Sequence, residues 1–178
     1  MTRRRISQRK RVHEAKRHIQ IVEGRIYRHF DMIDHIDRIT TRIASDGTGS
    51  IYMPSVDIFE HINPKSPPQG IVFNDNSFLV FKEIFHYDYL SEEATEPKII
   101  QIEYSFHFQM PQRRFFFRYD FHPEVGDRLT HPLHHLHAGG WFSETDSLPS
   151  IPRFPVSEVS LGDVLELIQV NFFLSSLN

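Results

Sequence analysis

The sequence contains no cysteine. This absence excludes disulfide frameworks and thiolate metal sites. There is no apolar run long enough to span a bilayer, and the N-terminal stretch MTRRRISQRKRVHEAKRH leads into no apolar segment of a secretory signal. No glycine-rich phosphate loop or dinucleotide fingerprint is present either. We therefore expect a cytoplasmic protein with no membrane segment, and we assign it no metal and no other cofactor.

Positive charge is scarce except at one end of the chain. The 178 residues suit one domain, and 39% hydrophobic with 13% aromatic residues argues against disorder. The net charge of -3 conceals ten Lys or Arg and only two acidic residues within residues 1–28. Such an arm is predicted to bind nucleic acid, or an acidic surface of its own chain or of a partner. The candidate nucleic-acid-binding residues are Arg3, Arg4, Arg5, Arg9, Lys10, Arg11, Lys16 and Arg17.

Apolar residues follow a heptad spacing between Val12 and Ile43. The two series are Val12, Ile19, Ile26 and Ile33, and Ala15, Val22, Ile36 and Ile43. This spacing predicts a long helix, or two helices broken near Gly24, with a narrow apolar seam. The seam would pack on the body of the same domain or on a second copy of the helix in a homodimer. The helix is expected to end within Ser45–Ser50, where two glycines favour a helix stop.

The rest of the chain has the pattern of an α+β domain. Three prolines between Asn63 and Gly70 predict a linker. The predicted division is a basic helical arm (1–45), a linker (46–69) and an α+β domain (70–178).

That domain is predicted to be an antiparallel β-meander of about four or five strands, followed by a C-terminal helix packed on the sheet. A hairpin is expected around Asn74–Asn76, and residues 99–109 alternate as a strand with one core face and one solvent face. Residues 114–120 read as the next strand, and Ser160 with Asp163 resembles a helix N-cap.

Five histidines lie within residues 122–137, directly after an Arg-Tyr-Asp sequence. Three kinds of site fit this segment. In acid–base catalysis, two imidazoles would deprotonate a ribose 2′-hydroxyl and protonate the leaving oxygen, with Arg118 or Arg128 on the phosphate.

In a zinc or manganese site, His135 and His137 would point to one side of an extended strand, with Asp120, His122 or His131 completing the set. In a structural cluster, the histidines would pair with carboxylates such as Asp120 and hold a long loop together.

The stretches RYDFHPEVGDRLTHPLHHLH and PRFPVSEVSLGDVLELI resemble the TumE-like toxins of bacterial toxin–antitoxin modules, over about residues 70–172. The resemblance implies a small cytoplasmic toxin that acts on RNA and is neutralised by an antitoxin, often one with a helix-turn-helix domain. The residues that match by position are Arg118, Tyr119, Asp120, His122, His131, His135 and His137.

The leading hypothesis is therefore a metal-independent endoribonuclease. In it, His135 and one of His122, His131 or His137 act as base and acid, with Arg118 on the phosphate. The alternative is a noncatalytic nucleic-acid-binding or oligomerising module with a structural histidine cluster. A metal-dependent nuclease or hydrolase is the third hypothesis.

Overall fold

The computed structural model describes residues 6–53, 69–124, 132–140 and 153–174. These residues form an α+β fold, as predicted, with an N-terminal helix α1 (Gln8–Tyr27), a large antiparallel sheet and a C-terminal helix α2 (Leu161–Ile168). Short helical turns cover Phe30–Met32, Pro111–Arg113 and Gln169–Leu174. The described strands are β1 (Ile33–Ile36), β2 (Thr40–Ile43), β3 (Gly49–Tyr52), β4 (Ile71–Phe73), β5 (Phe78–Asp88), β6 (Lys98–Met110), β7 (Phe115–Phe121), β8 (His134–Gly140) and β9 (Arg153–Pro155).

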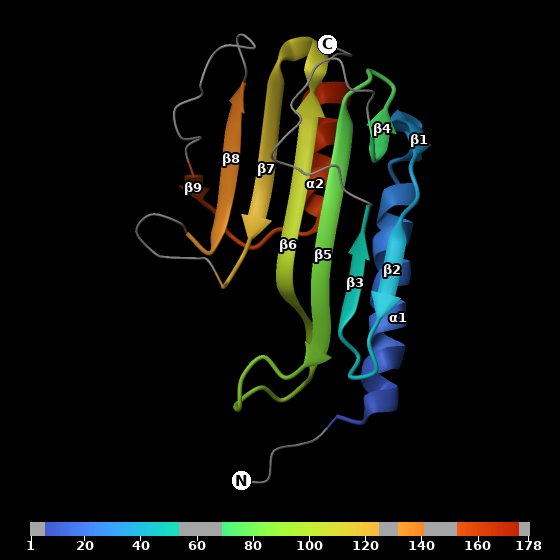
Figure 1. Ribbon diagram of the computed structural model, residues 1–178, viewed down its shortest axis with the longest axis vertical. Coiled ribbons are helices and arrows are strands. Elements are labelled where there is room, and N and C mark those ends of the chain that lie inside the picture. The colour runs from blue at the N-terminus through green and yellow to red at the C-terminus, as the bar shows by residue number, and fades with distance from the viewer. Residues whose placement is uncertain (1–5, 54–68, 125–131, 141–152, 175–178) are drawn as a thin grey trace.

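The strands form one sheet in the order β1-β4-β5-β6-β7-β8-β9, and β3 pairs with β5 and carries β2 on its other edge (Figure 1). The predicted meander is confirmed, because β5 to β9 are consecutive antiparallel neighbours. The predicted hairpin between β4 and β5 is also confirmed. Its turn contains Asn76 at a φ of 61°, and the Asp75 carboxylate accepts from the Ser77 amide. Asparagine tolerates this left-handed conformation better than most residues, which explains the turn.

The prediction of a helix reaching Ile43 is wrong. The helix ends at Tyr27, and β1 and β2 follow it. The segment is rich in isoleucine and threonine, whose branched side chains favour strands, and β4 and β3 supply the hydrogen-bonding partners. Residues 45–48 form a turn between β2 and β3 instead of a helix end. In this turn the Gly47 amide donates to the Ala44 carbonyl, at a Gly47 φ of 90°.

Both helices pack on one face of the sheet, behind it in the view of Figure 1. Helix α1 buries Ala15, Ile19, Val22 and Ile26, all from the predicted seam, in one core with the sheet. The seam is thus docked within the chain, whereas a homodimer through this helix stays a prediction. The division into arm, linker and toxin-like domain also stays a prediction. Among the described helices, none is long and apolar enough to cross a membrane.

Helix α2 begins with the predicted cap. The Ser160 hydroxyl accepts from the Asp163 amide, and the Asp163 carboxylate accepts from the Ser160 amide at 2.7 Å. Its buried stripe, Leu161, Val164, Leu165 and Ile168, packs into the same core as α1. Both helices therefore contribute to the core on one face of the sheet.

The alternation predicted that the other face of β6 is open to solvent, but part of this face is buried. Ser105, His107 and Gln109 are buried, although all three are polar. The prediction of a solvent face is wrong for this half of the strand. Polar groups are buried only where partners or a function compensate the loss of water, so this face is where a site is to be sought.

Candidate functional site

The strand register brings the chemistry of three strands together on the face away from the helices. Residues that lie opposite each other on neighbouring strands share a face, and the side chains alternate with a period of two. Two cross-strand rows result, Ser105–Asp120–His135 and His107–Arg118–His137. A local pattern of one strand does not reveal these rows, because they depend on long-range pairing.

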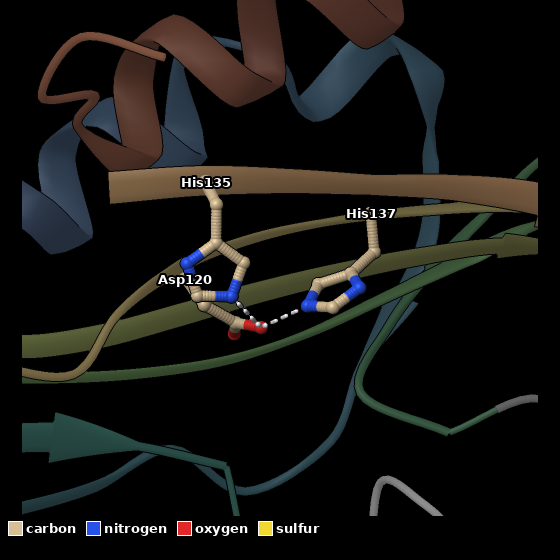
Figure 2. A group of neighbouring side chains, drawn as sticks. All are labelled: Asp120, His135 and His137. Carbon is tan, nitrogen blue, oxygen red and sulfur yellow. Dashed lines mark ion pairs between the residues drawn. The ribbon is translucent and has the colours of Figure 1, made fainter. Parts of the chain in front are cut away.

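Asp120 is the centre of the cluster (Figure 2). Its Oδ2 accepts a hydrogen bond from Arg118 Nε at 2.5 Å. The same oxygen lies 3.4 Å from His137 Nε2 and 3.7 Å from His135 Nε2. Figure 2 shows both histidines extending from β8 toward this carboxylate, on the side of the strand opposite the helices. One carboxylate oxygen is therefore shared by a guanidinium and two imidazoles.

The cluster is buried. Asp120 and His135 are each 1% exposed and His137 is 5% exposed. Within the described part of the chain, Asp120 Oδ1 and both ring nitrogens of His137 have no hydrogen-bond partner. A buried polar atom without a partner costs about 1–3 kcal/mol. Several such atoms in one small cluster indicate a site that is complete only when something else is bound there.

The ring orientation of His135 is fixed from behind. Its Nδ1 lies 2.7 Å from the carbonyl oxygen of Pro132, which is an acceptor, so Nδ1 carries the proton that it donates. In the neutral ring the lone pair is then on Nε2, the nitrogen that faces Asp120. A hydrogen bond of this kind behind the ring is typical of histidines that bind a metal or act on a substrate.

Burial keeps two histidines of this face neutral. The pKa of His137 is lowered to about 4, mainly by burial and in part by the positive charge of Arg118, against an opposing effect of Asp120. Burial likewise lowers the pKa of His107 to about 3, again with a contribution from Arg118. Near pH 7 both rings are therefore uncharged, so each has a lone pair on one ring nitrogen.

His122 lies at the rim of the cluster, just beyond the end of β7. Its Nε2 is 3.9 Å from Asp120 Oδ1, and its Nδ1 is 3.5 Å from Glu103 Oε1. Glu103 also accepts from Lys82 Nζ at 2.6 Å. The His122 side chain is 34% exposed, so it lies between the buried Asp120 carboxylate and the solvent.

The structure brings together five of the predicted site residues: Arg118, Asp120, His122, His135 and His137. Tyr119 is not among them, because alternation along β7 turns it to the helix face, where its ring contacts Phe117. His131 lies outside the described residues. His134 also points to the helix face, where its Nδ1 is 3.0 Å from the Tyr104 hydroxyl.

Sequence reasoning missed His107, which lies beside Arg118 in the second row. The alternation of residues 99–109 had placed it on the face opposite the core, which is the face of the cluster. The signal was present, but the interpretation of that face as solvent-exposed concealed it.

Helix α1, the described part of the basic arm that is helical, lies on the opposite side of the sheet from the cluster (Figures 1 and 2). Arg3, Arg4 and Arg5 are outside the described residues, whereas Arg9, Lys10, Lys16 and Arg17 are exposed on α1. Arg11 is half-buried and pairs with Asp88 at 2.6 Å. Part of the arm therefore contacts an acidic group of its own chain, which was one of the predicted alternatives.

Apart from the Asp120 cluster, a cavity of about 330 Å³ lies between α1, β5 and the start of α2. Its lining includes the buried pair of His18 and Glu83, whose Nε2 and Oε1 are 2.8 Å apart, and also Glu158 and Asp163. Three carboxylates outnumber the cationic groups there, so a phosphate would be repelled. The cavity is a poorer candidate than the Asp120 cluster for binding nucleic acid.

Comparison with known families gives one finding that covers the site. The family described as Toxin TumE matches residues 52–170, well over half of the chain. The match includes all residues of the Asp120 cluster and ends within the turn that follows α2. No curated protein and no solved structure matches the chain.

Proposed function

This chain belongs to the Toxin TumE family, and we propose that it is a toxin that cleaves RNA at the Asp120 cluster. The observation that carries the proposal is the convergence of Arg118, Asp120, His135 and His137 on one face of the sheet, within the region that matches the family. Buried imidazoles beside a guanidinium suit the chemistry of a phosphodiester better than that of a neutral substrate.

Cleavage of RNA by its own 2′-hydroxyl requires two proton movements. The 2′-oxygen loses its proton and forms a bond to phosphorus, while the bond from phosphorus to the 5′-oxygen breaks and that oxygen gains a proton. The products are a 2′,3′-cyclic phosphate and a 5′-hydroxyl. Arg118 is placed to stabilise the negative charge that develops on phosphate, and its hydrogen bond to Asp120 orients the guanidinium.

The metal-independent form of this reaction assigns the two proton transfers to histidines. His137 is neutral near pH 7, because burial lowers its pKa to about 4, and it suits the role of base better than that of acid. His122, at the exposed rim, is the better placed described residue to protonate the leaving oxygen. A bell-shaped pH–rate profile that persists in a chelator supports this form of the mechanism.

Membership in a toxin family also suggests an antitoxin as the protein partner. An antitoxin with a helix-turn-helix domain is the form that the family resemblance implies. Coexpression with the product of an adjacent gene is expected to restore growth and to yield a complex that copurifies. A cell that stays inhibited in the presence of every adjacent gene product contradicts this part of the proposal.

Burial favours a second candidate, a noncatalytic interaction module in which the cluster is structural. With Asp120 and His135 each 1% exposed, removal of either would leave its partners unsatisfied in the interior. This candidate predicts that cluster variants lose thermal stability, without any specific loss of activity in the molecules that remain folded.

The test compares histidines on the two faces of β8. His135→Ala and His137→Ala alter the cluster, whereas His134→Gln alters the neighbouring residue that points to the helix face. We expect the two cluster variants to lose about a hundredfold or more of toxicity on induction and of RNA cleavage in vitro. The control should retain both.

Three results would argue against the proposal in different ways. Wild-type cleavage by a folded His137→Ala variant would remove the cluster from the reaction. Toxicity with intact cellular RNA would exclude RNA as the target. A loss of activity that merely follows the loss of folded protein would favour the structural alternative.

A further inference from the structure

We infer that Asp120, His135 and His137 form a binding site for one divalent transition-metal ion, with Zn²⁺ as the best-fitting ion. The inference concerns the cluster of the proposed function, but metal binding itself does not depend on RNA being the substrate. Only the catalytic use of the ion rests on the proposed function. In this arrangement His137 is a ligand and leaves its role as base to another group.

The distances fit tetrahedral coordination. Zinc binds imidazole nitrogen and carboxylate oxygen at roughly 2.0–2.2 Å, so two ligand atoms of a tetrahedral site lie about 3.3–3.6 Å apart. Asp120 Oδ2 lies 3.4 Å from His137 Nε2 and 3.7 Å from His135 Nε2. One ligand atom from each of the three residues lies within 4.8 Å of the others. Small side-chain rotations therefore suffice to close the site around an ion.

The donor atoms are in the form that a metal requires. His135 donates its Nδ1 proton to the Pro132 carbonyl, which leaves the Nε2 lone pair toward Asp120. Both ring nitrogens of His137, and Asp120 Oδ1, have no hydrogen-bond partner among the described residues. Of these atoms, His137 Nε2 faces Asp120 Oδ2 at 3.4 Å (Figure 2), and an ion between them would satisfy this buried nitrogen.

Arg118 and the strand pairing supply the support that metal sites need. The guanidinium holds the Asp120 carboxylate through Oδ2, and that oxygen has a further lone pair for the ion. His135 and His137 alternate on one strand, and Asp120 is the register partner of His135 on the next, so the backbone positions all three ligands. Ligands held by a sheet are placed more accurately than ligands on loops.

The ligand types determine which ions fit. Two imidazoles and one carboxylate suit Zn²⁺, and also Mn²⁺, Fe²⁺ or Ni²⁺, whereas Mg²⁺ and Ca²⁺ prefer oxygen ligands. Three protein ligands leave a fourth tetrahedral position, as in catalytic zinc sites. With Asp120 negative and Arg118 and the ion positive, the site has a net charge of about +2 and would accept a phosphate oxygen or hydroxide there.

The experiment uses the full chain, produced without a histidine tag and treated with a chelator that is then removed. Calorimetric titration with ZnCl₂ is expected to give one ion per chain with a Kd below roughly 1 µM. His137→Ala and Asp120→Ala should each weaken binding by about a hundredfold or more. His134→Gln is the matched control, because it removes an imidazole from the same strand but from the other face, and it should bind as the wild type does.

A spectroscopic measurement keeps the test decisive if the variants do not fold. Titration of the wild type with Co²⁺ should produce the intense visible bands of tetrahedral coordination, and these should disappear when Zn²⁺ is added. Weak octahedral bands, no binding by the wild type, or equal binding by the wild type and a folded His137→Ala variant would each overturn the inference.

The metal inference and the RNA proposal fail in different ways. One Zn²⁺ per chain with no cleavage of RNA by the zinc-loaded protein supports the site and contradicts the function. RNA cleavage that is unchanged in a chelator, by a protein that binds no zinc, supports the function and contradicts the site.

Discussion

At the scale of single residues, the face of the cluster combines buried histidines with one carboxylate and one guanidinium. Arg118 and Asp120 neutralise each other, whereas His107 and His137 are kept neutral by burial. A group whose charged form is excluded from the folded state makes folding depend on pH. This dependence can be measured without knowledge of the substrate.

His107 should make the folded protein less stable in acid. Burial lowers its pKa from 6.5 to about 3, so between these values the unfolded chain binds more protons than the folded one. Stability is therefore full above about pH 6.5 and falls as the pH is lowered, by at most about 1.4 kcal/mol per pH unit for one such histidine. We expect His107→Gln to reduce this slope in urea unfolding between pH 7 and pH 4.5, measured with a chelator present.

The control is His13→Gln, which removes an exposed histidine from α1. Its slope should equal that of the wild type. An unchanged slope in His107→Gln would show that His107 is as accessible to protons in the folded state as in the unfolded state, which contradicts its burial.

At the scale of elements, strands could be predicted from the sequence where the spacing of apolar residues fits a strand and does not fit a helix. Strand β6 was expected because apolar and polar residues alternate along residues 99–109, and β7 was expected as the next strand after the turn that follows it. Strands β1 and β2 were missed because Ile33, Ile36 and Ile43 satisfy a heptad spacing as well as a strand pattern. Only the pairing partners, β4 for β1 and β3 for β2, decide between the two.

The candidate site could be predicted only in part for the same reason. Alternation correctly placed His135 and His137 on one side of a strand, and Asp120 was one of the residues expected to complete the set. The distances between the strands depend on register, which no local pattern contains. Burial of the polar face is likewise a property of the whole fold, so His107 was not recognised.

Helix α1 supports a prediction about the role of its buried stripe. Ile26 is 1% exposed in the core shared with the sheet, whereas Ile21 on the same helix is 45% exposed. Ile26→Asp should lower the free energy of unfolding by about 3 kcal/mol or more, because it removes apolar packing and buries a charge. Ile21→Asp introduces the same charge on the outer face and should change it by less than about 0.5 kcal/mol.

Chemical denaturation of the two variants measures this difference, and sedimentation of both shows the oligomeric state. Equal destabilisation by the two substitutions would contradict the docking of α1 on the sheet. A change of mass in Ile21→Asp alone would show that the outer face, not the seam, mediates self-association.

The cap of α2 gives a second prediction for an element. Ser160→Ala removes the hydroxyl that accepts from the Asp163 amide and should cost about 1 kcal/mol. Ser157→Ala, three residues earlier and exposed, is the control and should be close to neutral. If both variants unfold at the wild-type denaturant concentration, the cap contributes nothing measurable to the docking of α2.

At the scale of the whole molecule, the two faces of the sheet divide the predicted tasks. The helices and the exposed cations of α1 lie on one side, and the Asp120 cluster lies on the other (Figures 1 and 2). An RNA that contacts both must pass around an edge of the sheet. The arm therefore should contribute affinity and salt dependence, and the cluster should contribute chemistry.

A charge-neutralised arm tests this division. Deletion of residues 1–11 would also remove Arg11, which pairs with Asp88, and Ser7, whose hydroxyl caps α1, so substitution is the cleaner change. The variant replaces the four exposed cations Arg9, Lys10, Lys16 and Arg17 by glutamine. If each cation neutralises one phosphate of single-stranded RNA, the slope of log affinity against log salt should decrease by about 0.7 for each substituted cation.

Fluorescence anisotropy with a labelled single-stranded RNA, from low to moderate salt, measures the slope. The control neutralises Arg38 and Arg113, two exposed arginines that lie outside α1. It should retain the wild-type slope if RNA binds to the cations of α1. A decrease in the slope of the control would instead indicate a general effect of the protein's positive charge. The arm variant should still bind zinc as the wild type does, since no ligand lies on α1. A salt slope that is the same in the wild type and the arm variant would assign RNA binding to another surface. The exposed cations of α1 would then be candidates for binding the partner protein instead.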